Sequence, residues 1–139
     1  MPRSFPDSGV LSDAARAASP IRARTALYSL GDPQRTFLTS AFVRLETVPK
    51  AEYTGRTEEL AFYESFFRDQ EVEWCRDWEQ MIALADEESR RSGLGALDAL
   101  HVAAAHLLGA DELVTTEGIN KNVHRTRLVH VVYLYSLNF

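Results

Sequence analysis

The sequence predicts a three-layer α/β/α fold with a central, mainly parallel sheet. Segments with strand character alternate with helical segments along the 139 residues, and no internal repeat or linker-like stretch interrupts them. The last strand segment, residues 127–135, is largely apolar, as in strands that are covered on both faces. This alternation favours βαβ units and a parallel sheet with helices on both sides. We therefore expect a single domain that spans residues 1–139.

Local signals define the elements of the first half of the chain. Ser19 and Pro20 are a typical N-cap and first helical residue, and Ser40 is placed to cap the next helix. Pro6 makes the first strand irregular, and Pro49 is expected to end a helix. The expected elements are a strand at 3–7, a helix at 12–18, a helix from 20 to about 30, a strand at 35–39 and a helix from 41 to about 49.

The second half continues the alternation. Phe62 and Phe66 are aromatic residues at helical spacing, and Gly93 and Gly109 are placed to end helices. We expect these aromatic residues and the two tryptophans to belong to the core or to an interface. The expected elements are a helix at 57–69, a strand at 71–75, helices at 77–91 and 96–108, and strands at 112–116 and 127–135.

The composition bounds the environment of the protein. No apolar run approaches the length of a membrane span, so no membrane partner is expected. The N-terminus lacks the apolar region of a signal peptide, and Cys75 is the only cysteine, so a cytoplasmic location is expected. The formal net charge of −5 argues against broad non-specific nucleic-acid binding. It does not exclude a polyanionic substrate, because the charge would be −1 without four unusually placed acids.

Two of these four acids follow predicted strands. Asp7 comes after the first strand, and Glu117 comes after the strand at 112–116. Ligands of parallel sheets bind beyond the carboxyl ends of the strands, so both residues lie at a favourable place for a site. Alternative interpretations are that Asp7 caps the following helix and that Glu117 belongs to an ordinary loop.

The third acid, Glu46, lies on a helix face that it shares with Phe42 and Val43, whereas Arg44 and Thr47 are expected to face solvent. An acid on an apolar face is a poor choice for packing. The alternative is a glutamate at the edge of the helix that extends its carboxylate to water.

The fourth acid, Asp98, opens a helix that is apolar nearly all round and is therefore expected to be buried. The alternative is an acid favoured by the helix dipole. His101, one turn later, is interpreted as a core histidine satisfied by hydrogen bonds, with contact to Asp98 or to a substrate phosphate as the alternative. Burying lone carboxylates costs several kcal/mol each, so the four acids favour a shared hard divalent cation.

The residues around these acids resemble the PIN-domain family, which includes the VapC-type toxins of type II toxin–antitoxin pairs. The resemblance covers residues 3 to 135, and its most specific part lies between Leu97 and Glu117. The matching segments are PDSGVL, TSAFVRLE, LDALHVAAA and GADELVTTE. In many relatives the fourth acid is an aspartate, so the glutamate at 117 departs from the family pattern.

The resemblance implies an Mg²⁺- or Mn²⁺-dependent endoribonuclease with a PIN-like fold. It implies that Asp7, Glu46, Asp98 and Glu117 are both metal ligands and catalytic residues. It also implies an RNA substrate, an antitoxin partner and a homodimer, with the helix at 57–69 as a candidate lining of the antitoxin groove. No Cys/His cluster has the spacing of a zinc site.

Four further residues are candidates for binding or orienting the substrate: Ser40, Thr115, Thr116 and Lys121. For Ser40 the default is helix capping, and for the threonines it is a place in the strand with no role in the site. Lys121 begins the basic stretch 121–127, which is either a solvated loop or a guide for RNA.

Two other functions compete with the nuclease. The first is a non-catalytic PIN-like module that binds RNA or protein. The second is another acid-pocket α/β protein, such as a phospho-receiver or a haloacid-dehalogenase-like phosphatase. Those families need paired acids at the end of the first strand, whereas here Ser8 and Gly9 follow Asp7.

Overall fold

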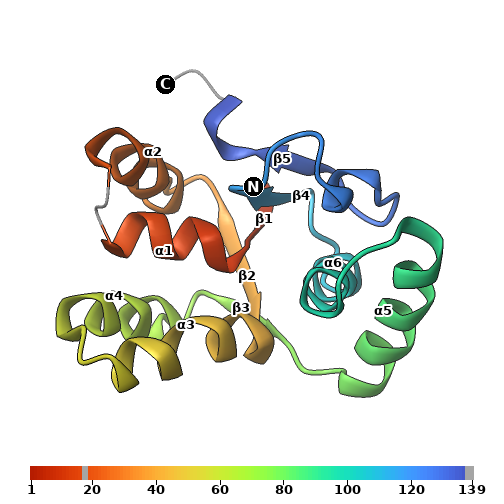
Figure 1. Cartoon of the computed structure of the whole chain (residues 1–139), viewed down its shortest axis with the longest axis horizontal. Helices are drawn as coiled ribbons and strands as arrows, with labels where there is room; N and C mark the ends of the chain where they lie inside the picture. Colours follow the sequence, from red (N-terminus) through yellow and green to blue (C-terminus); the bar gives the residue numbers. More distant parts are fainter. Residues whose placement is uncertain (17–18, 137–139) are drawn as a thin grey trace.

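A five-stranded parallel sheet forms the centre of the computed structural model, which describes residues 1–16 and 19–136 (Figure 1). The strand order is β3-β2-β1-β4-β5, and all four strand pairs are parallel. The expected α/β fold with a parallel sheet is therefore confirmed. The strands are β1 (Arg3–Pro6), β2 (Thr36–Ser40), β3 (Glu73–Cys75), β4 (Glu112–Thr115) and β5 (Val131–Tyr133).

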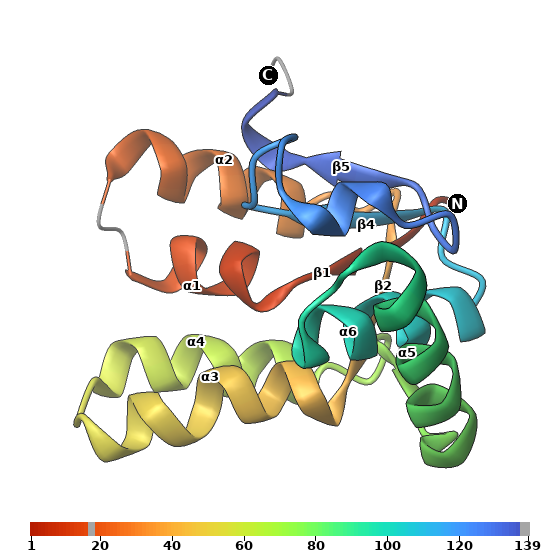
Figure 2. The same cartoon turned by 45° about the vertical axis from the view of Figure 1, so that its right-hand side comes forward.

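Helices cover the sheet from two sides. In Figures 1 and 2 the first four helices lie on one side and the last two on the other, as right-handed crossovers require when the strand order reverses after β3. The helices are α1 (Ser8–Arg16), α2 (Pro20–Leu30), α3 (Ala41–Tyr53), α4 (Thr57–Arg68), α5 (Trp78–Ser92) and α6 (Ala96–Leu107). Two short 3₁₀ helices follow, η1 (Asn122–Arg125) and η2 (Leu134–Ser136).

Local capping signals identified several helix ends correctly. Pro20 is the first residue of α2, and the Ser40 side chain accepts a hydrogen bond from the Phe42 amide at the start of α3. Gly93 ends α5 in the left-handed conformation, with φ of 71°. A side chain is strained in that conformation, which explains the glycine.

The first helix begins earlier than the sequence indicated. We expected a helix at 12–18, but α1 starts at Ser8, directly after Asp7. The Asp7 carboxylate accepts a hydrogen bond from the Val10 amide and thereby caps the helix. Residues 17–18 lie outside the described residues, so the expected end of the helix is not tested there.

The expectation that Pro49 ends a helix was wrong, because α3 continues to Tyr53 with Pro49 inside it. Pro49 removes the hydrogen bond to the carbonyl of Leu45, but both residues are exposed and water can satisfy that carbonyl. The last turns of α3 also place Val48 and Ala51 in the core. This burial offsets the cost of the proline.

The last strand is shorter than expected. Instead of a strand over 127–135, β5 covers only Val131–Tyr133, between the two 3₁₀ helices. It is an edge strand that pairs with β4 alone, and β4 itself has only four residues. A ladder cannot be longer than the strand that supplies its hydrogen bonds, so the apolar run 127–135 leaves the sheet at both ends.

The core lies around the three central strands. Phe5, Leu38 and Leu113 are fully buried, one from each of these strands. Tyr63 and Phe67 of α4 are buried with them, whereas Phe62 and Phe66 are partly buried against the same core. These four aromatic residues of α4 therefore pack mainly inward. Among the described residues, no helix is both long and apolar enough to cross a bilayer.

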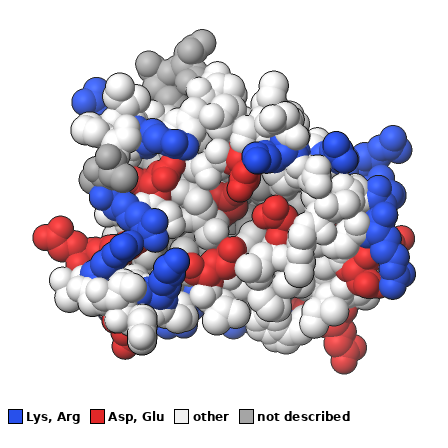
Figure 3. Space-filling model, in the orientation of Figure 1, with Lys and Arg blue, Asp and Glu red and all other residues white. Residues whose placement is uncertain are grey.

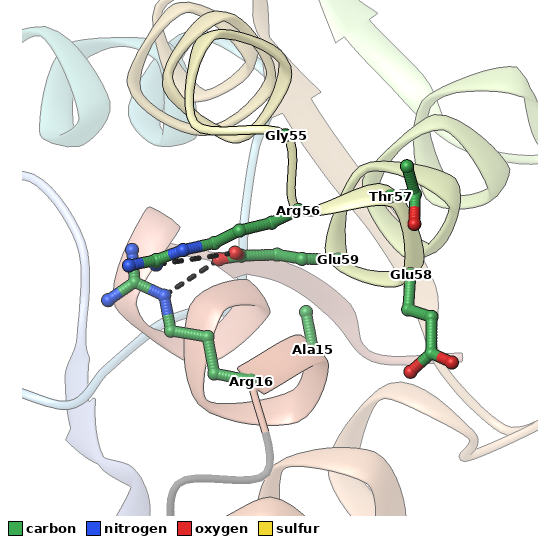
Figure 4. Close-up of a pocket in the computed structure, with 7 residues that line it drawn as sticks. All are labelled: Ala15, Arg16, Gly55, Arg56, Thr57, Glu58 and Glu59. Carbon is green, nitrogen blue, oxygen red and sulfur yellow. Dashed lines mark hydrogen bonds and ion pairs between the residues drawn. The ribbon is translucent and has the colours of Figure 1, made fainter.

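Inward-facing glutamates outside the sheet ends are neutralised by arginine. Glu59 accepts hydrogen bonds from Arg16 and Tyr63, both at 2.7 Å, and lies 3.5 Å from Arg56. Figure 4 shows Arg16 and Arg56 directed at Glu59 beside a cavity of about 490 Å³. Glu88 pairs with Arg91, and Glu112 pairs with Arg35. None of the four candidate acids lines the cavity of Figure 4.

Replacement of Glu59 by alanine is expected to lower the free energy of unfolding by about 2 kcal/mol at pH 7, because it removes two hydrogen bonds from a buried carboxylate. Desolvation by itself raises the pKa of Glu59, but Arg16 and Tyr63 hold it below its usual value. This stabilisation is therefore present above the unfolded pKa of about 4.3 and is lost as the pH falls through the lower folded pKa.

Urea denaturation at pH 7 and at successively lower pH measures this loss. The control is Glu58→Ala, the exposed neighbour, which we expect to change stability by less than about 0.5 kcal/mol. Equal losses in the two variants would contradict the prediction.

Candidate active site

Asp7 lies where the first strand meets the first helix. Its amide continues the sheet by donating to the Val114 carbonyl at 2.9 Å. One carboxylate oxygen caps α1 through Val10, and the other accepts a hydrogen bond of 2.5 Å from the Thr115 hydroxyl. Desolvation raises the pKa of Asp7 to about 6, although these hydrogen bonds oppose the rise. Asp7 therefore both caps α1 and lies at the carboxyl end of β1, so the two interpretations of this residue hold together.

Glu46 is held by a histidine and a serine. The Nε2 atom of His101 lies 2.5 Å from the Glu46 carboxylate, and the Ser8 side chain is near enough to lower the pKa of this carboxyl group. Desolvation alone raises the pKa of Glu46, but His101 and Ser8 hold it below its usual value. His101 is 3% exposed and contacts Glu46 rather than Asp98. The expectation of a buried, hydrogen-bonded histidine is confirmed for one of its two ring nitrogens.

The other ring nitrogen of His101 indicates how the pair is arranged. Nδ1 is buried and has no hydrogen-bond partner among the described residues. An unpaired acceptor lone pair is less costly there than an unpaired N–H group. The Nε2 atom therefore carries the N–H group that is donated to the Glu46 carboxylate.

One neighbour of Glu46 differs from expectation. Thr47 is buried, not solvent-facing, and its hydroxyl donates to the Val43 carbonyl at 3.0 Å. A threonine can turn its hydroxyl back onto its own helix, and its methyl group then packs inward. The exposed positions of this turn are Arg44 and Leu45.

Asp98 lies in the first turn of α6, and the expectation that it is buried was wrong. The residue is exposed, although α6 is buried from Val102 to Ala105. Neighbouring atoms still desolvate its carboxyl group, and together with the negative charges of Glu117 and Glu46 they raise its pKa, while His101 opposes the rise. Asp98 thus lies at the N-terminal end of α6, and the alternative interpretation, an acid favoured by the helix dipole, stays a prediction.

Glu117 is exposed on the loop after β4. Its amide donates to the Thr115 hydroxyl at 3.0 Å, and its carbonyl accepts from His124 at 2.8 Å. Thr115 thus donates to Asp7 and accepts from Glu117, so one hydroxyl connects two of the four acids. The backbone of Glu117 is held by these two bonds, and its side chain is exposed.

The four acids share one electrostatic environment. Asp98 raises the pKa of Asp7, and Glu46 and Glu117 raise that of Asp98. Figure 3 shows acidic side chains around a hollow at the centre of this face, in the region that Figure 1 shows between α1, α3 and α6. Among the described residues, no arginine or lysine pairs with any of the four, in contrast to Glu59, Glu88 and Glu112. The negative charge of the site is therefore not balanced by any arginine or lysine that the structure describes.

The donor set fits a hard cation, but the arrangement is open. Within residues 1–16 and 19–136, no three acidic, histidine or cysteine side chains converge closely enough to form a ready-made metal site. Carboxylates that lack a counter-charge repel one another, which favours such an open arrangement. The available donors at the four acids are oxygens, and the nearby imidazole of His101 uses its Nε2 atom for Glu46. Oxygen donors suit Mg²⁺ or Mn²⁺ better than zinc.

The predicted orienting residues have different surroundings. Ser40 is buried and caps α3, as the default interpretation expected. Thr115 contacts Asp7 directly, and Thr116 packs against Gly9 at the start of α1. Lys121 is exposed just before η1, and its side chain forms no hydrogen bond or ion pair with a described residue. Roles of these four in binding substrate stay predictions.

Two residues of the site were missed by sequence reasoning. Ser8 holds Glu46, and Gly9 makes room for Thr116: a Cβ atom at Gly9 would lie 2.2 Å from the Thr116 hydroxyl and 3.3 Å from the Asp7 carboxylate. The signal was present in the segment Asp7-Ser8-Gly9, where a small polar residue and a glycine follow the acid directly.

Replacement of Gly9 by alanine is expected to lower the free energy of unfolding by about 1–3 kcal/mol, because Thr116 must move away from the new methyl group. The movement also disturbs Asp7. Gly95→Ala is the matched control: its added Cβ atom meets nothing within 4 Å, so we expect a change below about 1 kcal/mol. Urea denaturation compares the two, and a Gly9 variant as stable as the control would refute the close packing.

Known structures share this fold. One is VapBC2 from Rickettsia felis bound to a promoter DNA fragment, with a TM-score of 0.70 and 15% identity over 94% of this chain and 97% of that chain. A second is a toxin–antitoxin complex from Klebsiella pneumoniae, with a TM-score of 0.66 and 17% identity over 91% and 94% of the two chains. A third is FitAcB from Neisseria gonorrhoeae, with a TM-score of 0.68 and 15% identity over 96% of this chain and 99% of that chain.

The sequence supports the same grouping independently. No curated protein sequence matches the chain significantly. The family model of the PIN domain, however, matches residues 4–123, a stretch that contains all four candidate acids. The match covers most of the chain, and the protein therefore belongs to the PIN domain family.

Proposed function

We propose that this protein is an Mg²⁺- or Mn²⁺-dependent endoribonuclease and the toxin of a type II toxin–antitoxin pair. Members of the PIN domain family are generally nucleases. The observation that carries the proposal is the unbalanced charge of the site. Three other inward-facing glutamates each pair with arginine, whereas Asp7, Glu46, Asp98 and Glu117 pair with no arginine or lysine among the described residues.

Asp7, Glu46 and Asp98 would hold one or two divalent ions, and Glu117 would bind directly or through water. When bound, the metal supplies positive charge that activates water and offsets the charge developing on the phosphodiester group. A shared cation also removes the repulsion that raises the pKa of Asp98. Desolvation is the largest cause of the raised pKa of Asp7. A positive charge is most effective near a carboxylate that water does not surround.

The surrounding residues prepare the acids for this role. His101 and Ser8 keep Glu46 ionised and restrict its carboxylate, which is a ligand only in the charged form. Thr115 and the Val10 amide orient Asp7. The RNA strand would lie at the carboxyl ends of the strands, where the exposed side chains of Asp98 and Glu117 are accessible.

The proposed partners follow from the solved relatives of the fold. One of the three is a toxin–antitoxin complex by name, the Klebsiella pneumoniae complex. We propose that this chain likewise binds an antitoxin protein, forms a homodimer and acts on RNA in the cytoplasm. The partly buried aromatic residues of α4 leave less apolar surface for an antitoxin groove than the sequence indicated.

Substitution of Asp98 by asparagine is expected to lower metal-dependent RNA cleavage by at least about 100-fold, because it removes a charged ligand without changing side-chain size. Cleavage of a labelled RNA in Mn²⁺ measures the effect, and growth arrest on expression in bacteria should disappear in parallel. The control is Asp86→Asn, which alters an exposed aspartate of α5 that pairs with Arg90.

Mn²⁺ is also expected to raise the melting temperature of the unaltered protein, and less so that of the Asp98 variant, by binding linkage. Undiminished cleavage by Asp98→Asn would refute the assignment of this residue. A melting temperature that ignores Mn²⁺, together with no cleavage, would favour the non-catalytic module instead.

Substitution of Asp7 by asparagine is expected to stabilise the metal-free protein at pH 7–8. The folded pKa of about 6 lies above the unfolded value of about 3.9, so the unaltered protein loses stability as the pH rises between these values. One pKa unit corresponds to about 1.4 kcal/mol, which bounds the gain at roughly 3 kcal/mol.

Urea denaturation in EDTA at pH 4, 6 and 8 measures this difference, which should be smallest at pH 4 and shrink again when Mg²⁺ is added at pH 8. A difference between Asp7→Asn and the unaltered protein that is independent of pH would show that the carboxyl group of Asp7 is not desolvated as described.

A further inference from the structure

A basic cavity lies beside the acid site and has no place in the function proposed so far. It has a volume of about 390 Å³ and forms where the end of α5 meets the loop that carries η1. Figure 3 shows Lys and Arg side chains gathered along that edge of the face, to the right of the acid-lined hollow. The residues that line the cavity are Arg91, Ser92, Gly93, Arg125 and Arg127.

Two of the three arginines in this cavity have no counter-charge. Arg125 and Arg127 are exposed, and no carboxylate in the described part of the chain forms an ion pair with either. The chain has more acids than bases, 20 against 15, and many of its other arginines are paired. Two unpaired guanidinium groups at one cavity therefore provide a local positive potential in an acidic protein.

A buried carboxylate holds the two walls of the cavity together. Glu88 is 2% exposed, and one of its oxygens lies 2.6 Å from the Arg91 guanidinium. Its other oxygen accepts a hydrogen bond from the hydroxyl of Thr126, the residue between Arg125 and Arg127. Asn122 of the same loop donates to the Gly93 carbonyl at 3.0 Å. The loop is thus attached to α5 at two points, and its arginines are presented on an ordered support.

The same loop also begins at the acid site. It leaves β4 at Glu117, whose carbonyl accepts a hydrogen bond from His124, the residue before Arg125. One ordered segment therefore carries an acid of the site at one end and the unpaired arginines at the other. A ligand with regularly spaced negative charges would contact the arginines at one end and a divalent cation held by the acids at the other.

We propose that the cavity of Arg91, Arg125 and Arg127 binds a backbone phosphate of the RNA strand at a distance from the cleaved bond. Guanidinium groups bind phosphate oxygens in paired, charge-assisted hydrogen bonds. An acidic peptide offers similar chemistry, but continuity with the acid site favours a polymer of phosphates. The inference rests on the proposed nuclease function and adds a contact that positions the substrate.

The test is RNA binding by the double variant Arg125→Gln/Arg127→Gln. Fluorescence anisotropy of a labelled single-stranded RNA in EDTA, where metal-dependent cleavage cannot occur, gives Kd as a function of salt. Loss of two phosphate contacts should weaken binding at least about 10-fold at low salt and reduce the slope of log K against log salt by about 1.4. Both residues are exposed, so the melting temperature should not change.

The matched control is Arg24→Gln/Lys50→Gln, which removes the same charge from exposed positions of α2 and α3 and should leave the slope unchanged. Two results would overturn the proposal: an equal slope of log K against log salt for the unaltered protein and both variants, or an equal loss of RNA affinity in the two variants. So would a cavity variant that binds RNA normally but loses affinity for an aspartate-rich peptide.

The outcome for the nuclease function is read separately, from cleavage by the unaltered protein in Mn²⁺. Cleavage with normal RNA binding by the cavity variant refutes the phosphate contact alone. Absence of cleavage together with arginine-dependent binding refutes the nuclease and leaves an RNA-binding cavity.

Discussion

The parallel pairing of β1 with β4 is the constraint on which the site depends. Pro6 lies opposite Val114 in this register. Asp7, which follows β1, and Thr115, which ends β4, therefore come into contact although 108 positions separate them. The Thr115 hydroxyl then connects Asp7 to the amide of Glu117. A slip of one residue would turn these side chains to opposite faces of the sheet and would separate the acids.

Charge balance distinguishes the site from the rest of the molecule. Inward-facing glutamates elsewhere have arginine partners, as burial of a carboxylate requires. The acids at the strand ends have only hydrogen bonds from hydroxyl groups, backbone amides and one imidazole. These contacts orient a carboxylate without neutralising it. The described residues thus leave a local negative charge without an arginine or lysine partner, and the proposed divalent ion would offset it.

The loop after β4 joins two regions of opposite charge. It fixes the backbone of Glu117 through His124 and fixes Arg125 and Arg127 through the bond of Thr126 to Glu88. An acidic centre flanked by a basic cavity suits a polyanion that is attacked at one phosphate and held at another. The overall charge of −5 conceals this arrangement, because the two regions offset each other in the sum.

The sequence by itself determined the order of strands and helices, the caps at Pro20, Ser40 and Gly93, and the four acids as a group, because these signals are local or match a family pattern. Only the tertiary structure decided that α3 passes through Pro49, that β5 is short, and that His101 holds Glu46 rather than Asp98. It also decided that Thr47 is buried and Asp98 exposed. Each of these outcomes depends on contacts with residues that are distant in the sequence. The local sequence pattern does not indicate which residues those are.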